Sequence, residues 1–132
     1  MRNQIISVFV GAVFVLLFFG SCIPDDNNDL NPTDKFLGTW SVSDQALRIN
    51  YQVDIAYNPL NSSEVLLSNF ADLGQVAVGL VVGNSIVIES QTLSNSYSVT
   101  GTGSFVNESK LNFNYELSDG IDVESRKAIF SK

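Results

Sequence analysis

Histidine is absent from this 132-residue chain, and cysteine and tryptophan occur once each. Without histidine the chain lacks the commonest general base and the usual partner of a serine or cysteine nucleophile. It also has no glycine-rich phosphate loop, no metal-ligand spacing and no Gly-x-Ser-x-Gly motif. Two of the carboxylates that remain, Asp54 and Glu116, fall on the outward side of predicted strands. We therefore expect no enzyme, no catalytic residues, and no metal or cofactor site.

Positive charge is also scarce. Seven Lys and Arg residues stand against 14 Asp and Glu residues, for a net charge of −7. A chain this acidic repels the phosphates of nucleic acid and of anionic lipid headgroups, and it has no basic run that would offset the repulsion. The composition excludes nucleic acid as a partner.

One long apolar run stands at the N-terminus, from Ile5 to Phe19, preceded by Arg2. Its 15 residues are fewer than the roughly 20 that span a bilayer core, and no basic cluster follows it. This arrangement is typical of a secretory signal that is removed by cleavage. We assign residues 1–21 to a cleaved signal helix and expect no permanent transmembrane helix.

The apolar run ends at Phe19-Gly20-Ser21-Cys22, which contains the single cysteine. This sequence resembles the lipobox of bacterial lipoproteins. The resemblance implies a diacylglyceryl group on the Cys22 sulfur, cleavage just before Cys22, and acylation of the new amine. Two or more acyl chains are enough for stable membrane anchoring. The alternative is that Cys22 is a buried thiol that follows an ordinary cleaved signal.

Residues 23–35 read IPDDNNDLNPTDK, with four aspartates and no apolar periodicity. This composition predicts a solvated linker, so we describe residues 22–35 as a lipidated acidic tether. Acidic residues directly after a lipidated cysteine resemble the signal that carries some Gram-negative lipoproteins to the outer face of the outer membrane. The resemblance favours a lipid-anchored protein of the outer membrane at the cell surface over one on the periplasmic face. A plain polar linker is the other interpretation.

Residues 36–132 form one domain in which apolar and polar residues alternate. The clearest run extends from Leu47 to Tyr57, and the pattern returns from Leu111 to Leu117. Alternation with a period of two indicates strands with one buried face. We predict eight strands, at residues 36–43, 46–57, 64–70, 75–82, 85–91, 95–106, 110–117 and 122–131. A short helical turn is expected within residues 68–74.

The connections between these strands are short. Gly83-Asn84 and Asp119-Gly120 are hairpin turn signals. They predict an all-β fold, an eight-stranded antiparallel up-and-down meander that closes into a barrel. A two-sheet sandwich is the second architecture that these strands could form. Glycines inside predicted strands indicate bends, bulges or close approaches; they are Gly79, Gly101 and Gly103.

The first predicted strand opens with FLGTW, residues 36–40. Its Gly-x-Trp resembles the start of the calycins, the superfamily of lipocalins and fatty-acid-binding proteins. Residues 22–132 are similar to the calycin-like lipoproteins of Gram-negative bacteria. The resemblance implies a small antiparallel barrel with a basic side chain from late in the chain packed over Trp40. We expect that side chain to be Arg126, with residue 36 near 130, residue 40 near 126, and Lys127 pointing outward. The alternative is that Arg126 and Lys127 only straddle a solvated strand edge.

Two functions are expected from this fold. The first is a non-enzymatic interaction or envelope module whose loops, at residues 58–64 and 70–75, meet an unknown protein. The second is a carrier that binds a small apolar ligand between aromatic side chains; the candidates are Trp40, Tyr51, Tyr97, Phe113 and Tyr115. In so small a barrel the same aromatics can simply fill the core. The volume of the barrel interior distinguishes the module from the carrier, because a drug-sized ligand needs a cavity of about 300 Å³ or more.

Overall fold

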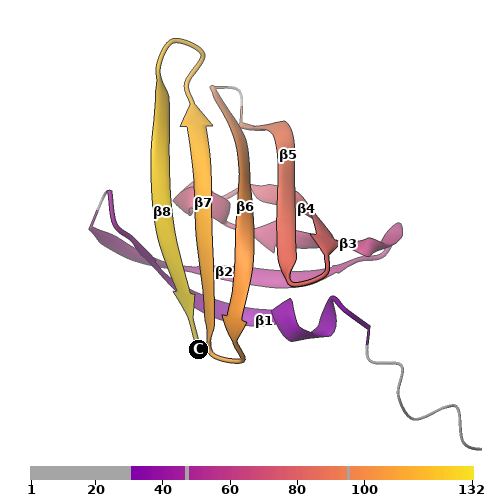
Figure 1. Cartoon of the computed structure of the whole chain (residues 1–132). Coiled ribbons are helices and arrows are strands. Elements are labelled where there is room, and N and C mark those ends of the chain that lie inside the picture. The colour runs from indigo at the N-terminus through magenta and orange to yellow at the C-terminus, as the bar shows by residue number, and fades with distance from the viewer. Residues whose placement is uncertain (1–30, 47, 95) are drawn as a thin grey trace, which may run out of the picture. The chain divides into compact units, whose positions relative to one another are not determined.

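The computed structural model describes residues 31–46, 48–94 and 96–132, so the predictions for residues 1–30, Cys22 included, lie outside the described residues. The strands, shown in Figure 1, are β1 (Gly38–Asp44), β2 (Ile49–Asn58), β3 (Asn61–Ser68), β4 (Val76–Val82), β5 (Ser85–Ser94), β6 (Tyr97–Asn107), β7 (Lys110–Ser118) and β8 (Val123–Ser131). Two 3₁₀ turns accompany them, η2 (Asp34–Phe36) and η3 (Phe70–Asp72). The helical turn predicted before the fourth strand is confirmed as η3. Residue 36, predicted as strand, instead ends η2.

Each strand pairs antiparallel with the next, and β1 pairs with β8, so the sheet closes on itself. This confirms the predicted eight-stranded up-and-down barrel. Two of the strand pairings are short. Residues 80–82 of β4 pair with residues 85–87 of β5, and residues 41–44 of β1 pair with residues 128–131 of β8. In Figure 1, β5–β8 run steeply across the direction of β1–β4. Over residues 31–46, 48–94 and 96–132, no helix is long and apolar enough to cross a membrane.

The alternation in the sequence places the core inside the barrel. In β7 every second side chain from Leu111 to Leu117 is buried, and those between, from Asn112 to Glu116, are exposed. Burying one large apolar side chain contributes about 1.5–3 kcal/mol, so the inward faces of the strands supply most of the driving force for closure.

The Gln91 side chain bridges the point where β4 and β5 separate. Its Oε1 accepts a hydrogen bond from the Val78 N–H at 2.8 Å, and its Nε2 donates to the Val78 carbonyl at 2.9 Å. A side-chain amide offers the same donor and acceptor as a strand backbone. Val78 therefore keeps both of its backbone hydrogen bonds beyond the point where β4 and β5 stop pairing.

Gly101 and Gly103 allow β6 to lie close to the aromatic side chains of β7. A Cβ atom on Gly103 would fall 2.3 Å from Phe113 Cζ, and one on Gly101 would fall 2.4 Å from Tyr115 Cβ. Real Cβ atoms do not approach other atoms so closely. Gly103 therefore makes room for the Phe113 ring, and Gly101 for the backbone and Cβ of β7 at Tyr115.

Candidate functional site: the barrel ends and an outer groove

One end of the barrel is closed by η2. Its Phe36 is fully buried, and the Phe36 carbonyl accepts a hydrogen bond from Trp40 Nε1 at 2.8 Å. The Phe36 ring meets Phe105 edge-on, with centroids 5.9 Å apart. Trp40 is thus a buried residue of this closed end.

A late basic side chain does pack over Trp40, but it is Lys132 and not Arg126. The Lys132 Nζ lies 4.3 Å from the centroid of the Trp40 ring and donates to the Leu37 carbonyl at 2.7 Å. The observed register pairs Val42 with Phe130, whereas the predicted register placed residue 36 near 130. β1 begins only at Gly38, and only its second half pairs with β8. The C-terminal end of β8 therefore lies beside Trp40.

Removing the Lys132 side chain should destabilise this end. Lys132 is exposed, and an exposed cation over an indole ring contributes about 0.5–1 kcal/mol, so we expect Lys132→Ala to lower the free energy of unfolding by about that amount. It should also shift the fluorescence of Trp40, the single tryptophan. Lys127→Ala, an outward change on the same strand, is the control. A shift caused by the Lys127 change and not by the Lys132 change would contradict the observed register.

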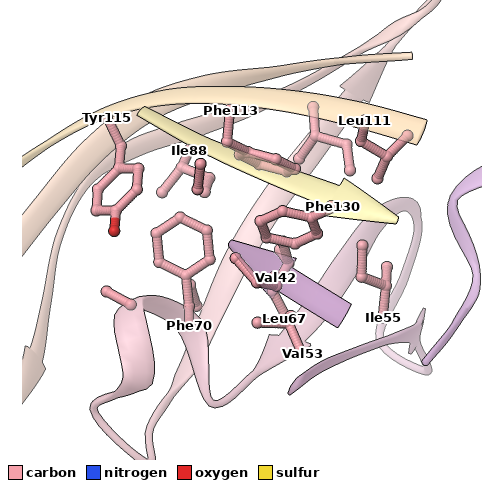
Figure 2. Close-up of a cluster of buried hydrophobic side chains, with 14 of the residues drawn as sticks. Val42, Val53, Ile55, Leu67, Phe70, Ile88, Leu111, Phe113, Tyr115 and Phe130 are labelled. Atoms are coloured by element: carbon pink, nitrogen blue, oxygen red, sulfur yellow. The ribbon is translucent and has the colours of Figure 1, made fainter. Parts of the chain in front are cut away.

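The other end is closed by η3. Its Phe70 points into the barrel, toward Phe113 and Tyr115, as Figure 2 shows. The Phe70 ring centroid lies 5.0 Å from that of Tyr115 and 5.8 Å from that of Phe113, and Phe113 stacks on Phe130 at 4.4 Å. Phe70 is 1% exposed. Aromatic side chains therefore fill this end of the interior.

The loop that carries Phe70 is held in an uncommon conformation. Asn69, Ala71 and Asp72 all have positive φ, at 65°, 57° and 60°. Residues other than glycine rarely adopt these angles, so neighbouring contacts must hold them. The Asn69 side chain accepts a hydrogen bond from the Gly74 N–H at 2.8 Å and donates to the Gln52 carbonyl at 3.0 Å. These bonds tie η3 to β2.

The predicted aromatic residues do not gather at one mouth. Phe113 and Tyr115 lie together under η3, Tyr51 is half-buried beside Tyr115, and Trp40 is at the opposite end. Tyr97 begins β6 and is 36% exposed.

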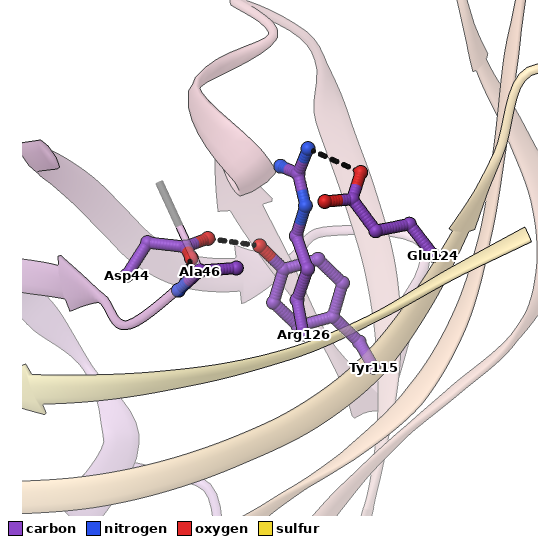
Figure 3. A network of polar contacts seen from close by, with 5 residues as sticks. All are labelled: Asp44, Ala46, Tyr115, Glu124 and Arg126. Carbon is purple, nitrogen blue, oxygen red and sulfur yellow. Dashed lines mark hydrogen bonds and ion pairs between the residues drawn. The ribbon is translucent and has the colours of Figure 1, made fainter. Parts of the chain in front are cut away.

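A buried polar cluster lies beside Phe70 and is drawn in Figure 3. Asp44, only 1% exposed, accepts hydrogen bonds from the Tyr115 hydroxyl at 2.8 Å and from the Ala46 N–H at 2.9 Å. Arg126 sits directly opposite Tyr115 in the β7–β8 register and pairs with Glu124 at 2.9 Å. The prediction that Arg126 faces inward is confirmed, although its partners differ from those expected. Asp44 was not predicted, yet it follows Trp40 and Val42 on the inward side of β1.

Burial in this cluster raises the pKa of two phenols. The pKa of Tyr51 rises to about 12, chiefly through burial, with its hydrogen bond to Tyr115 acting in the opposite direction. The pKa of Tyr115 is also raised, first by burial and then by the nearby Tyr51 and Asp44. Both side chains are therefore neutral hydrogen-bonding groups at ordinary pH.

These shifts predict a loss of stability in alkali. In the unfolded chain both phenols ionise near pH 10, whereas in the native protein Tyr51 keeps its proton to about pH 12. The native state then binds more protons, so the free energy of unfolding should fall as the pH rises above about 10. Denaturant titrations from neutral to alkaline pH measure this slope. Tyr51→Phe and Tyr115→Phe should reduce it and Tyr57→Phe, an exposed control, should not. An equal slope in all four proteins would contradict the assignment.

A groove of about 860 Å³ runs over the outer face of β5–β8. The register aligns Val87, Thr102, Asn114 and Lys127 in one row across the four strands. A second row contains Thr100, Glu116 and Ser125. Gln45 lies beside the first row, because its N–H donates to the Lys127 carbonyl at 3.0 Å.

The chemistry of this groove suits recognition. Hydroxyl, amide, carboxylate and ammonium groups of the two rows all point outward, so they can form hydrogen bonds with a partner. The groove was not predicted, because the sequence interpretation placed recognition in the loops. Its signal is the repeated Ser, Thr and Asn on the outward side of β6 and β7.

Among the described residues, no group of three or more Cys, Asp or Glu side chains is placed to hold a metal ion. No protein-family model, curated protein or solved structure matches this chain.

Proposed function

We propose that this chain is a lipoprotein anchored through Cys22 in the outer membrane and facing the cell surface, and that its barrel is a non-enzymatic interaction or envelope module. The observation that supports a module over a ligand carrier is the filled interior. Phe70, Phe113 and Phe130 are buried against one another where a ligand would sit. The groove of about 860 Å³ instead lies on the outer face, where a partner can reach it.

A calycin-like origin is part of this proposal. The eight-stranded antiparallel barrel is compatible with it. Support comes from the closed end, where Trp40 of the Gly-x-Trp sequence bonds to the 3₁₀ turn and a late lysine packs on its ring. A late basic side chain over Trp40 is the feature that the resemblance implied, with Lys132 in the role expected of Arg126.

The anchor is tested by Cys22→Ser in the full chain. Because the acyl groups need the cysteine sulfur and the new amine, we expect the variant to lose its acyl label and to move from the membrane fraction to soluble fractions. Ser21→Ala keeps a small residue before the cysteine and is the matched control, which should remain labelled. Acyl label on the Cys22→Ser protein would refute the anchor.

The module is tested by native mass spectrometry of the purified full chain. We expect the mass of the lipidated polypeptide with no further component, because aromatic side chains occupy the interior. An apolar compound that co-purifies in stoichiometric amount would favour the carrier instead, since η3 would then have to move to admit it.

A further inference from the structure

The tip of the β7–β8 hairpin exposes two aliphatic side chains. Ile121 is 91% exposed and Val123 is 64% exposed. Burying these side chains against a partner removes apolar surface from water, which favours binding. Figure 1 shows this hairpin at the top of the view, extending beyond the upper ends of β5 and β6.

The tip is held in one shape by its own hydrogen bonds. Asp119 Oδ1 accepts from the Ile121 N–H at 2.9 Å and from the Asp122 N–H at 2.7 Å, and the Asp119 N–H donates to the Asp122 carbonyl at 3.2 Å. Gly120, with φ of 92°, supplies the left-handed residue of the turn. A surface that is already ordered loses less entropy when it binds.

The charge around these side chains is negative. Asp119 and Asp122 flank Ile121, and Glu116 lies on the outward face of the neighbouring strand. Hydrogen bonds from the backbone of residues 121 and 122 hold the pKa of Asp119 below its usual value. The ion pair between Arg126 and Glu124 is the one salt bridge formed in the part of the chain that the structure describes. The tip therefore combines an apolar contact with carboxylates that no lysine or arginine there neutralises.

Exposed aliphatic side chains beside carboxylates indicate which kind of partner the tip can bind. Anionic headgroups would be repelled, and a second copy of the chain would bring the same charges together. A positively charged protein surface with an apolar recess complements both features. The outer groove continues the same face, because Glu116 and Ser125 line it and Val123 is the next outward residue on β8.

We propose that the β7–β8 tip is the recognition element of the barrel and that it inserts Ile121 into an apolar recess on a basic protein. This inference rests on the proposed interaction module and names the chemistry of its partner. The β2–β3 tip provides a neutral comparison. Its Leu60 is 92% exposed, and its turn is fixed in the same way, with Asn58 Oδ1 accepting from the Leu60 N–H at 3.0 Å.

The test uses a displayed library of short random peptides, selected on the full-length protein in neutral detergent. Peptides that bind the wild type are counter-selected on Ile121→Ser in one arm and on Leu60→Ser in the other. We expect only the first arm to retain binders, enriched in Lys and Arg beside a bulky apolar residue. Their synthetic forms should bind Ile121→Ser about tenfold more weakly, and Asp122→Asn more weakly with a smaller salt dependence.

Three results would overturn the proposal: enriched peptides that carry no net positive charge, equal binding by wild type and Ile121→Ser, or equal losses in Ile121→Ser and Leu60→Ser. Insertion of the tip into zwitterionic vesicles, lost in Ile121→Ser, would also overturn it in favour of a lipid contact. Thr102→Trp, which fills the groove, distinguishes failure of the tip proposal from failure of the proposed interaction module. If it abolishes peptide binding while Ile121→Ser does not, the module stands and the tip is not its recognition element.

Discussion

Phe70→Ala is expected to lower the free energy of unfolding by about 3–5 kcal/mol, the range for removing a buried aromatic side chain. Phe70 is 1% exposed and touches the rings of Phe113 and Tyr115. Since the loop around it already holds three residues at positive φ, it has little freedom to collapse into the space left behind. Denaturant unfolding measures the loss, and Leu60→Ala, at an exposed position, is the control.

The same variant also tests whether the Phe70 ring is what fills the interior. With the ring gone, the end of the barrel under η3 gains an apolar cavity, and such cavities bind small apolar molecules. We expect the Phe70→Ala protein, and not the wild type, to bind a hydrophobic dye or benzene. A loss of stability below about 1 kcal/mol with no gain of binding would show that Phe70 does not fill the interior as described.

Gly103→Val is expected to cost about 3 kcal/mol or to prevent folding, at or beyond the upper end of the usual cost of overpacking. Gly103 lies directly opposite Phe113 in the β6–β7 register, and its Cβ would fall 2.3–2.6 Å from three atoms of that ring. The ring cannot retreat, because it stacks on Phe130 at 4.4 Å. Thermal unfolding of the variant measures the cost.

Two further variants make this result specific. Thr102→Val, on the exposed face of the same strand, adds a similar side chain where there is room and should change stability by less than about 0.5 kcal/mol. In Gly103→Val/Phe113→Ala the overlap is removed, so the two changes together should cost less than their sum. Additive effects would mean that the ring and the glycine do not compete for one space.

Much of the fold could be predicted from alternation and turn signals within short segments of the sequence. Alternation from Leu111 to Leu117 depends on strand geometry alone, so it predicted which side chains of β7 face inward. The hairpin signals at residues 83–84 and 119–120 both fall in the observed connections, because such turns depend on their own residues. η3 was predicted as a helical turn, but that Phe70 enters the barrel could not be, since it depends on space left by other strands.

The candidate site, too, was only partly predictable from the sequence. Asp44 shares the inward side of β1 with Trp40 and Val42, so its direction was visible in the sequence. Its burial was not, because that requires the Tyr115 hydroxyl, which lies 71 positions further along the chain. The outer groove likewise needs β5–β8 to be aligned before their outward rows form a surface.

By itself, the sequence determined that the domain is an antiparallel meander and, where the alternation is clear as in β7, which face of the strand is buried. The tertiary structure decided the register at which β8 meets β1. Predicted and observed registers differ by six residues, since Phe130 pairs with Val42 and not with residue 36. Side chains alternate with a period of two, so a shift by an even number keeps every residue on its face. Alternation alone therefore cannot distinguish Arg126 from Lys132 as the partner of Trp40; the packing of η2 and the closure of the barrel do.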